Sequence, residues 1–316
     1  MIVTGGDALV DLVDDGRAQW PVAGGGPFNT AIALGRLDVT VGFLGPISRD
    51  AYGQMLSHEL VAAGVDTSLV RWTDSPTARA IVHKQHDGRN EYTFELAGSS
   101  LVDLTPDDLP VLPPEAWAVY VGTLALAIDP PAAAYEALVE REAGRRQIIF
   151  DPNVRPAIFG GVASYRARFE RLAALAYLVK LSDDDAAWIY PQLRLAEVVE
   201  LILGFGPHIV AVTRGERGAV AASGNAFVDV AGISVDVVDT VGAGDSFGAA
   251  MVAALVDERA LGPRATRTPD NAVLNRATSY AVAASAITCT RAGAVPPSRE
   301  EIEAQLRTRA GRMFSR

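Results

Sequence analysis

Short hydrophobic runs rich in β-branched residues recur along the chain and alternate with longer amphipathic segments. The short runs span residues 39–44, 118–121, 147–150, 178–181 and 208–212. The longer segments, of which residues 28–37, 132–143 and 196–203 are examples, have the length and periodicity of helices that bury one face. Apolar strands separated by helices favour a parallel sheet that is covered on both faces. The pattern therefore predicts an α/β fold.

Two stretches, approximately residues 8–22 and 77–97, interrupt this alternation. The second contains strand-like runs at 80–83 and 92–94 on either side of a polar turn at 87–90. Such hairpin patterns predict a small antiparallel accessory sheet. No repeat, low-complexity tract or interdomain linker is visible, so we expect one domain over residues 1–316. A surface loop between two helices is expected at 262–271, which holds two prolines and several charges.

Composition narrows the class of protein. A chain of 316 residues with 49% hydrophobic residues can bury a substantial core. The net charge of −10 disfavours broad attraction to nucleic acid or to anionic membranes. The single cysteine, Cys289, cannot form an intrachain disulfide, and the first residues lack the pattern of a signal peptide. No run approaches about 18 apolar residues, so we expect no membrane span. The single cysteine fits a reducing cytoplasm, and the charge disfavours nucleic-acid partners.

A candidate anion site lies near residue 242. Residues 235–240 form a strand-like run, Gly242, Ala243 and Gly244 follow, and a helical stretch begins near Asp245. Small residues let several backbone N–H groups point into one concavity, and the start of a helix adds roughly half a positive charge. A phosphate group fits such a site. Asp245 would stay ionised there and could accept a proton from an attacking hydroxyl.

The same residues allow two other interpretations. Asp245 could be an ordinary helix N-cap that follows a tight turn. The glycine pair could also belong to a nucleotide-cofactor oxidoreductase. The dinucleotide fingerprint, however, requires a third glycine where Phe247 stands, and its acidic partner should end a second strand, whereas Asp257 and Glu258 lie in helical sequence.

Residues 239–247, Asp-Thr-Val-Gly-Ala-Gly-Asp-Ser-Phe, closely resemble the C-terminal signature of the PfkB-type, ribokinase-like carbohydrate kinases. The resemblance implies that Asp245 is the catalytic base and that the backbone of Gly242, Ala243 and Gly244 forms the anion hole for the transferring phosphoryl group. It also implies the ribokinase-like three-layer fold, with a mainly parallel central sheet flanked by helices and a small β-sheet lid formed by the segments near 8–22 and 77–97.

The resemblance extends to the sugar side of the family's site. Residues 24–31 resemble its N-terminal glycine signature, and residues 6–11 resemble its first-strand motif. Carboxylates suit neutral polyols because each can accept two hydroxyl hydrogen bonds. The sugar-binding residues implied in this way, together with the stretch 151–156 discussed below, are Asp7, Asp11, Gly25, Gly26, Asn29, Thr123, Asn153 and Arg155.

Three further stretches resemble the nucleotide side. Residues 212–218 resemble the Thr-x-Gly-x-x-Gly turn beside the ATP phosphates, although they also fit a β-hairpin turn, and residues 291–294 resemble the Arg-x-Gly-Ala element near the adenine. The implied nucleotide-binding residues are Lys180, Thr213, Gly215, Gly218 and Gly293. The implied cofactors are ATP, Mg²⁺ and a monovalent cation such as K⁺ near Asp239. Where relatives carry the Asn-x-x-Glu motif that helps organise Mg²⁺, this chain has Ser182 and Asp185, so Asp185 is a candidate metal ligand or a helix-capping residue.

The resemblance leaves several acceptor sugars possible, because different branches of the family act on different sugars. Residues 151–156 resemble the Asp-x-Asn-x-Arg segment of fructokinases and 2-keto-3-deoxygluconate kinases, which ribokinases usually lack. Arg155 could form a charge-assisted fork to a phosphate or to a substrate carboxylate. The arginine common in the lid strand of fructokinases is absent from residues 92–100. We therefore expect a fructokinase-like enzyme, with a 2-keto-3-deoxygluconate kinase, a ribokinase or a non-catalytic sugar-binding protein as alternatives, and a homodimer formed through the lid.

Overall fold

The computed structural model describes residues 1–14, 19–84, 90–156, 158–159, 161–224, 226–265 and 268–313. Most of the polar turn predicted at 87–90 lies outside the described residues.

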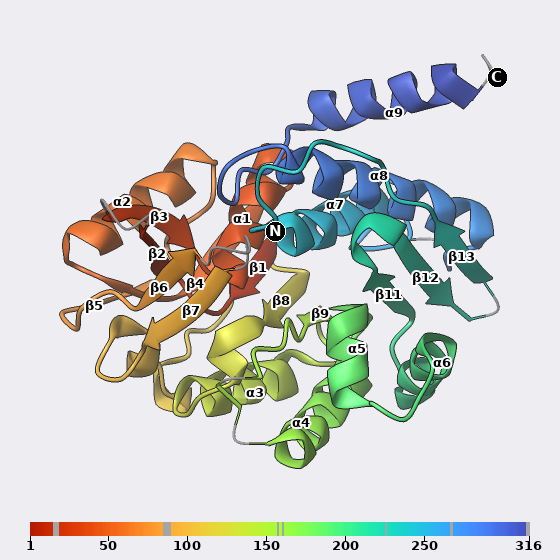
Figure 1. The fold of residues 1–316 in the computed structure, drawn as a ribbon. Coiled ribbons are helices and arrows are strands. Elements are labelled where there is room, and N and C mark those ends of the chain that lie inside the picture. Colours follow the sequence, from red (N-terminus) through yellow and green to blue (C-terminus); the bar gives the residue numbers. More distant parts are fainter. Residues whose placement is uncertain are drawn as a thin grey trace.

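A nine-stranded sheet forms the centre of the molecule (Figure 1). From one edge to the other its strands are β13 (Ala226–Val230), β12 (Ala219–Ser223), β11 (Ile209–Thr213), β10 (Leu178–Ser182), β9 (Gln147–Asp151), β8 (Ala118–Gly122), β1 (Ile2–Gly5), β4 (Val41–Ser48) and β5 (Val70–Thr73). All pairs from β11 to β5 are parallel, whereas β12 and β13 join antiparallel at one edge. The predicted α/β architecture is confirmed.

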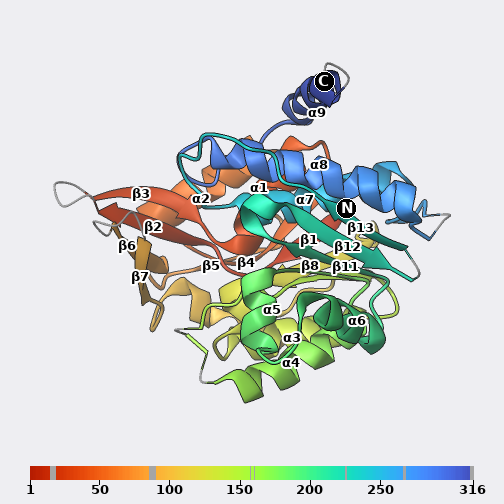
Figure 2. The same ribbon diagram turned by 45° about the vertical axis from the view of Figure 1, so that its right-hand side comes forward.

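Helices cover both faces of this sheet, so that the molecule has three layers (Figure 2). On one face lie α1 (Gly26–Arg36), α2 (Ala51–Ala62), α7 (Ala243–Asp257) and α8 (Asn271–Cys289). On the other face lie α3 (Pro131–Glu142), α4 (Val162–Leu175), α5 (Asp183–Ile189) and α6 (Leu195–Phe205). The last helix, α9 (Arg299–Met313), contacts α8 and projects from the body.

Each face of the sheet has its own hydrophobic core. Along β1, Ile2 belongs to the core beneath α1 and α7, whereas the next residue, Val3, belongs to the core on the side of α3 and α4. Both side chains are fully buried. Successive residues of a strand point to opposite faces, so a strand buried on both sides must be apolar throughout. This requirement explains why the strands of this chain read as continuous apolar runs.

The second sheet, called the lid sheet below because it contains the segments predicted as a lid, has four strands in the order β3 (Gln19–Gly24), β2 (Leu9–Asp14), β6 (Arg79–Lys84) and β7 (Asn90–Glu95). The pairs β2–β3 and β6–β7 are antiparallel, as predicted, but the central pair β2–β6 is parallel. The predicted small accessory sheet is therefore present, with antiparallel outer pairs and one parallel pair at its centre. The central pair is parallel for a topological reason. Strand β2 follows β1 and strand β6 follows β5, and both leave the carboxyl ends of these parallel strands in the same direction.

The strand predicted over residues 235–240 is also wrong, because this segment is irregular. The backbone N–H groups of Val238 and Asp239 donate to the carbonyl oxygen of Cys289, at 2.8 and 3.3 Å, so the end of α8 takes the place of a neighbouring strand. The side chain of Val237 is 63% exposed. The apolar alternation here reflects surface valines rather than a buried sheet. The loop predicted at 262–271 does connect α7 with α8.

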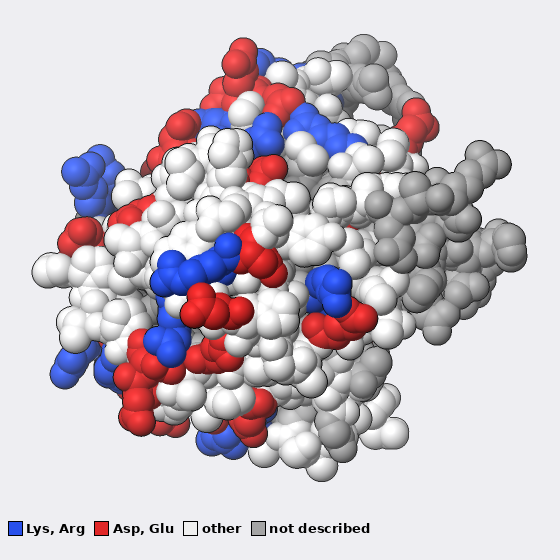
Figure 3. All heavy atoms as spheres, turned by 90° about the vertical axis from the view of Figure 1, so that its left-hand side faces the viewer, with Lys and Arg blue, Asp and Glu red and all other residues white. Residues whose placement is uncertain are grey.

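Basic and acidic side chains are interspersed on the face that carries the lid sheet and α2 (Figure 3). Salt bridges such as Arg49–Asp74 at 3.4 Å and Arg71–Asp108 at 3.1 Å pair the two signs. Among the helices of the described chain, none combines the length and the apolar character required to cross a bilayer.

Candidate active site

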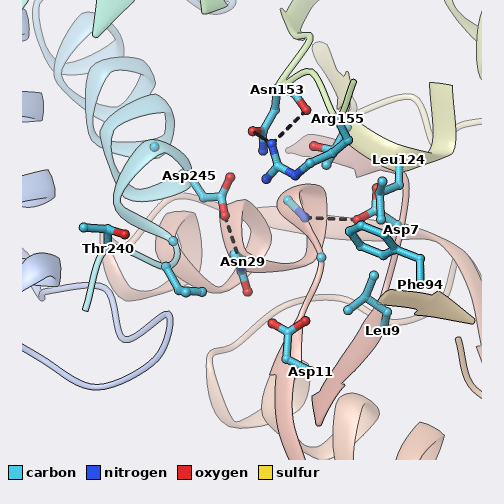
Figure 4. Close-up of a pocket in the computed structure, with 16 residues that line it drawn as sticks. Asp7, Leu9, Asp11, Asn29, Phe94, Leu124, Asn153, Arg155, Thr240 and Asp245 are labelled. Atoms are coloured by element: carbon cyan, nitrogen blue, oxygen red, sulfur yellow. Dashed lines mark hydrogen bonds between the residues drawn. The ribbon is translucent and has the colours of Figure 1, made fainter. Parts of the chain in front are cut away.

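A cavity of about 330 Å³ lies between the carboxyl ends of the central strands, the start of α7 and the lid sheet (Figure 4). Its lining includes every residue predicted to bind sugar and three of the four predicted around the phosphoryl group. These lining residues are Asp7, Asp11, Gly25, Gly26, Asn29, Thr123, Asn153, Arg155, Gly242, Gly244 and Asp245. Segments more than 200 residues apart in the sequence thus meet at one site, as expected for a parallel sheet whose loops converge at one edge.

Five lining residues were not predicted as site residues. They are Leu9, Phe94, Leu124, Thr240 and Val241. Three of them adjoin predicted positions and Leu9 lies between Asp7 and Asp11, so local proximity was the available signal. Phe94 was not among the predicted site residues, yet β7 brings its ring to the cavity wall opposite α7.

Asp245 is buried, and a hydrogen bond holds its carboxylate in place. It is the third residue of α7, and its side chain makes no capping hydrogen bond, so its interpretation as a helix N-cap was wrong. Its carboxylate is 7% exposed, and its Oδ2 accepts a hydrogen bond from Asn29 Nδ2 at 2.9 Å. Burial raises the pKa of Asp245 to about 7, against the opposing influence of Lys180, Asn29 and Arg155. A base with this pKa is poised near neutral pH.

The loop before α7 is the predicted anion site. Gly242 has φ of 73°, and a Cβ there would lie 2.5 Å from Ala294 Cβ, so both conformation and space require glycine. The N–H of Ala243 turns inward to the carbonyl of Thr240 at 3.3 Å, and Ala243 does not line the cavity. Because the preceding segment is not a strand, the strand–glycine–helix unit of a dinucleotide-binding fold is absent from these residues.

Asp7 follows β1 and is fully buried. Its Oδ2 accepts the N–H of Gly26 at 3.2 Å, and its Oδ1 accepts the N–H of Ala125 at 3.3 Å. Burial raises its pKa to about 6, while these backbone hydrogen bonds lower it. Gly26 approaches the next loop so closely that a Cβ would lie 2.2 Å from Thr123 Oγ1. The carboxylate is therefore fixed in orientation by backbone that admits no larger residue.

One guanidinium faces the three carboxylates of the cavity. Arg155 Nη1 donates to Asn153 Oδ1 at 2.6 Å, and the head group lies on the cavity side that faces Asp245 and Asp7 (Figure 4). Asp11 reaches the cavity from the lid strand β2, and burial raises its pKa to about 6. Arg155 lowers the pKa of each of these aspartates, whereas Asp7 raises that of Asp11.

The residues predicted to bind nucleotide lie outside this cavity. They are Lys180, Thr213, Gly215, Gly218 and Gly293. The turn at 214–218 joins the antiparallel strands β11 and β12, so its interpretation as a hairpin turn is confirmed. The N–H of Gly293 donates to Asp239 Oδ2 at 3.0 Å, which ties this element to the anion loop. Lys180 is 3% exposed, and its Nζ would lie 3.0 Å from a Cβ on Gly244, which lines the cavity.

Asp185 forms a capping box with Ser182 at the start of α5. Ser182 Oγ accepts the N–H of Asp185 at 3.0 Å, and Asp185 Oδ2 accepts the N–H of Ser182 at 2.9 Å. Its Oδ1 accepts the N–H of Val154 at 2.8 Å. The capping interpretation is confirmed. In the described part of the chain, no three histidine, cysteine, aspartate or glutamate residues are grouped closely enough to hold a metal ion.

Known proteins are similar to this chain in sequence and in structure. Residues 6–301 match the family described as pfkB family carbohydrate kinase. A fructokinase of Rhizobium leguminosarum bv. trifolii is 37% identical over 281 residues, which cover 87% of this chain and 85% of that protein. The crystal structure of fructokinase from Vibrio cholerae O395 with fructose, ADP and calcium ion has a TM-score of 0.84 and 27% identity, covering 96% of this chain and 98% of that one.

A protein that acts on another substrate is equally similar in fold. The crystal structure of aminoimidazole riboside kinase from Salmonella enterica, with aminoimidazole riboside and an ATP analog, has a TM-score of 0.83 and 25% identity, covering 96% of this chain and 99% of that one. The predicted ribokinase-like fold is confirmed by these likenesses. The chain therefore belongs to the pfkB family of carbohydrate kinases and is a sugar kinase similar to the fructokinases.

Proposed function

We propose that the protein transfers the γ-phosphoryl group of ATP to a hydroxyl of a neutral keto sugar, with fructose as the first candidate. The observation that carries this proposal is the charge of the cavity, where the described lining residues include the carboxylates of Asp7, Asp11 and Asp245 and one cation, Arg155. An acidic sugar would bring a fourth carboxylate against these three, whereas hydroxyl groups can donate to them. This charge balance favours fructose over 2-keto-3-deoxygluconate.

Asp245 acts as the general base in this proposal. Asn29 occupies its Oδ2, and no described residue is hydrogen-bonded to Oδ1, which can therefore accept the proton of the sugar hydroxyl. As that proton moves to Asp245, the hydroxyl oxygen forms a bond to the γ-phosphorus. The bond from this phosphorus to the β–γ bridging oxygen breaks, and ADP leaves. The start of α7, with Gly242 and Gly244, offers backbone N–H groups to the charge of the transferring group.

The remaining cavity residues hold and cover the sugar. Asp7 and Asp11 accept its hydroxyls, and Thr123, Asn153 and Arg155 supply further polar contacts. Apolar side chains suit the C–H faces of a sugar ring, and Leu9 and Phe94 bring such surface from the lid sheet. A lid that closes over the sugar would exclude water and so protect ATP from hydrolysis.

ATP would lie beside Thr213, Gly215, Gly218 and Gly293, next to the anion loop. Mg²⁺ prefers oxygen ligands and is commonly held by nucleotide phosphates together with one or two carboxylates. Asp185 serves as the cap of α5, and we propose that Mg²⁺ enters bound to the phosphates, where it would neutralise their charge. Asp239 stays the candidate for a monovalent cation site, because a carboxylate that accepts two backbone N–H groups still has lone pairs for a cation.

A substrate panel tests this function. ADP release with ATP and Mg²⁺ is measured for fructose, ribose, aminoimidazole riboside and 2-keto-3-deoxygluconate. We expect kcat/KM for fructose to exceed that for the sugar acid by at least about tenfold, the effect of one unfavourable charge contact of about 1.4 kcal/mol. A preference for the sugar acid would overturn the proposed selectivity. Calorimetric sugar binding without any transfer would instead support a non-catalytic sugar-binding protein.

We further propose that two chains associate through their lid sheets. Strands β3 and β7 are the edges of the lid sheet, and Trp20 on β3 is 39% exposed. A small sheet with an exposed aromatic residue gains stability when a second copy covers it. The single-domain organisation and the cytoplasmic location stay predictions of the sequence.

A further inference from the structure

Three polar side chains are buried together beneath α7, outside the cavity. Asp151 on β9 accepts at its Oδ2 a hydrogen bond from Lys180 Nζ on β10, at 2.8 Å, and one from the hydroxyl of Tyr120 on β8, at 3.3 Å. Their relative exposures are 2%, 3% and 1%. Taking an ion pair out of water costs free energy that its own attraction seldom exceeds. A buried pair this close to an active site therefore calls for a functional explanation.

Strand register brings these three side chains together. Ile149 pairs with Tyr120 on one side and with Leu178 on the other. Asp151 and Lys180 each follow two residues later, on the same face of the sheet, because side chains alternate along a strand. That face packs against α7, whose apolar residues share a core with Tyr120, Ile149 and Leu178. The ion pair thus replaces apolar residues at the end of an otherwise hydrophobic layer.

Helix α7 rests directly on this group through two glycines one turn apart. A Cβ on Gly244 would lie 3.0 Å from Lys180 Nζ, and a Cβ on Gly248 would lie 2.4 Å from the Tyr120 hydroxyl oxygen. Residues at i and i+4 occupy one face of a helix, so this face meets Lys180 and Tyr120 at once. The ammonium group consequently lies against the first turn of the helix that carries Asp245.

The charges around this group are unevenly matched. Lys180 faces the carboxylates of Asp151, Asp245 and Asp185. Asp245 faces Lys180 and Arg155, which lower its pKa, and Asp151, which raises it. Asp151 Oδ1 has no hydrogen-bond partner among the described residues. The groups that face Asp151 are Lys180, Asp185, Asp245, Tyr120 and Tyr165. Since the pKa of Lys180 is raised by its acidic neighbours, the ammonium stays charged at neutral pH.

We propose that Lys180 and Asp151 are positioning residues for phosphoryl transfer. Asp151 and Tyr120 hold the Lys180 ammonium beneath Gly244, and this fixed positive charge keeps Asp245 ionised and supports the anion site at the start of α7. Lys180 then acts through Asp245 and the helix rather than by touching the nucleotide. The inference rests on the proposed function, in which Asp245 is the base.

The first test measures kcat, both KM values and the pH dependence of kcat/KM with fructose for Lys180→Met and Asp151→Asn. Removing the ammonium should lower kcat at least about tenfold and move the acidic limb of the profile to higher pH, with little change in either KM. Removing the negative charge should move the same limb to lower pH and lower kcat less, because the amide oxygen of the new side chain can still accept a hydrogen bond from Lys180. Opposite movements are the signature of two charges acting on one base.

The double variant Lys180→Met/Asp151→Asn covers the case in which Lys180→Met alone does not fold, because it removes both charges of the buried pair together. Its acidic limb should lie near that of the wild type, whereas its kcat should stay at least about tenfold low. A wild-type kcat in the folded double variant would overturn the proposal, and so would a limb that moves in neither single variant. If Lys180→Met does not fold, the comparison uses Asp151→Asn and the double variant.

A matched control is Glu142→Gln, which disturbs a buried carboxylate that accepts hydrogen bonds from Arg141 and Arg146 far from the cavity. This change should lower the Tm without moving the pH profile. Failure of the proposed function has a different outcome, since wild-type protein would then transfer no phosphoryl group at all. If the wild type is active but neither variant moves the pH profile, this inference is refuted while the proposed function stands.

Discussion

At the scale of single residues, the site depends on carboxylates that are buried and yet must ionise. Asp245 is 7% exposed, and its pKa is raised from 3.8 to about 7, with burial as the largest cause. Asn29 and the cations Lys180 and Arg155 work against this effect. The balance leaves a carboxyl that can gain or lose its proton near neutral pH, as the proposed general base requires.

Replacement of this base should separate chemistry from binding. We expect Asp245→Asn to lower kcat by roughly 10²–10⁴-fold, the contribution typical of general base catalysis, while the Kd for fructose changes little. Steady-state kinetics and calorimetry measure the two effects. The exposed Asp107, changed to Asn, serves as the control and should behave as the wild type. An unchanged kcat in the Asp245 variant would remove this residue from its role.

The same variant should gain stability, with a sign that follows from the raised pKa. A carboxyl whose folded-state pKa exceeds its unfolded value favours the protonated folded form, so the folded state loses stability as pH rises from about 4 through about 7. A neutral asparagine at this position carries no such cost. Thermal unfolding should therefore show a higher Tm for Asp245→Asn than for wild type at pH 8, and a smaller difference at pH 5. A larger difference at pH 5 would contradict this linkage.

In the wild type, the acidic limb of kcat/KM for fructose should have its midpoint near pH 7, because only ionised Asp245 can accept the proton. Activity should rise through this limb as pH increases. A buffer series at constant ionic strength measures it. A profile that is flat from pH 5.5 to 8 would show that no group with this pKa limits the reaction.

At the scale of elements, α7 connects the chemistry to the sheet. Its first turn carries Gly244 and Asp245, and its next turn rests on β8 at Gly248, where the Tyr120 hydroxyl leaves no room for a Cβ. Interiors are packed densely enough that one added methyl group must displace a neighbour. The position of Asp245 is therefore set by contacts one turn further along the helix.

Gly248→Ala should destabilise the protein by about 1–3 kcal/mol and lower kcat, because its Cβ would lie 2.4 Å from the Tyr120 hydroxyl oxygen. Removing that hydroxyl makes space, so Gly248→Ala/Tyr120→Phe should recover most of the lost stability. Gly204→Ala is the matched control, since Gly204 lies in α6, where the added methyl group would have no described atom within 4 Å, and it should gain about 0.5–1 kcal/mol. Equal effects of both alanines would refute the packing argument.

At the scale of the whole molecule, the lid sheet has two tasks in this proposal. Its inner side brings Asp11 and Phe94 to the cavity, and its strand edges and Trp20 are available to a second copy. A lid that is shared between two chains would couple closure of the site to association. The central sheet, buried under helices on both faces, supplies the rigid platform against which such closure can occur.

The protein should elute at twice the monomer mass in light-scattering chromatography, and Trp20→Lys should shift it to the monomer. Trp20 is 39% exposed on β3, and a lysine there removes apolar area and adds a charge that repels its copy. Val111→Lys is the control, because Val111 is 90% exposed on a segment outside the lid sheet. A wild type that is monomeric at all concentrations would refute the proposed dimer.

The sequence by itself determined the α/β class and the main residues of the site. Buried parallel strands must be apolar on both faces, so their positions are visible in the local pattern. Asp7, Asn29 and Asp245 lie in short motifs at the end of a strand or the start of a helix. Local chemistry also offered helix capping, beside metal binding, as a role for Asp185. Each of these features depends on residues that are close together in the chain.

Only the tertiary structure decided which distant segments meet. It revealed that residues 235–240 bond to the end of α8 instead of a strand, that β2 and β6 are parallel, and that Phe94 reaches the cavity. It also paired Lys180 with Asp151 beneath α7. These contacts depend on strand register and helix docking, which are set by the packing of the whole molecule, so no local pattern of side chains specifies them.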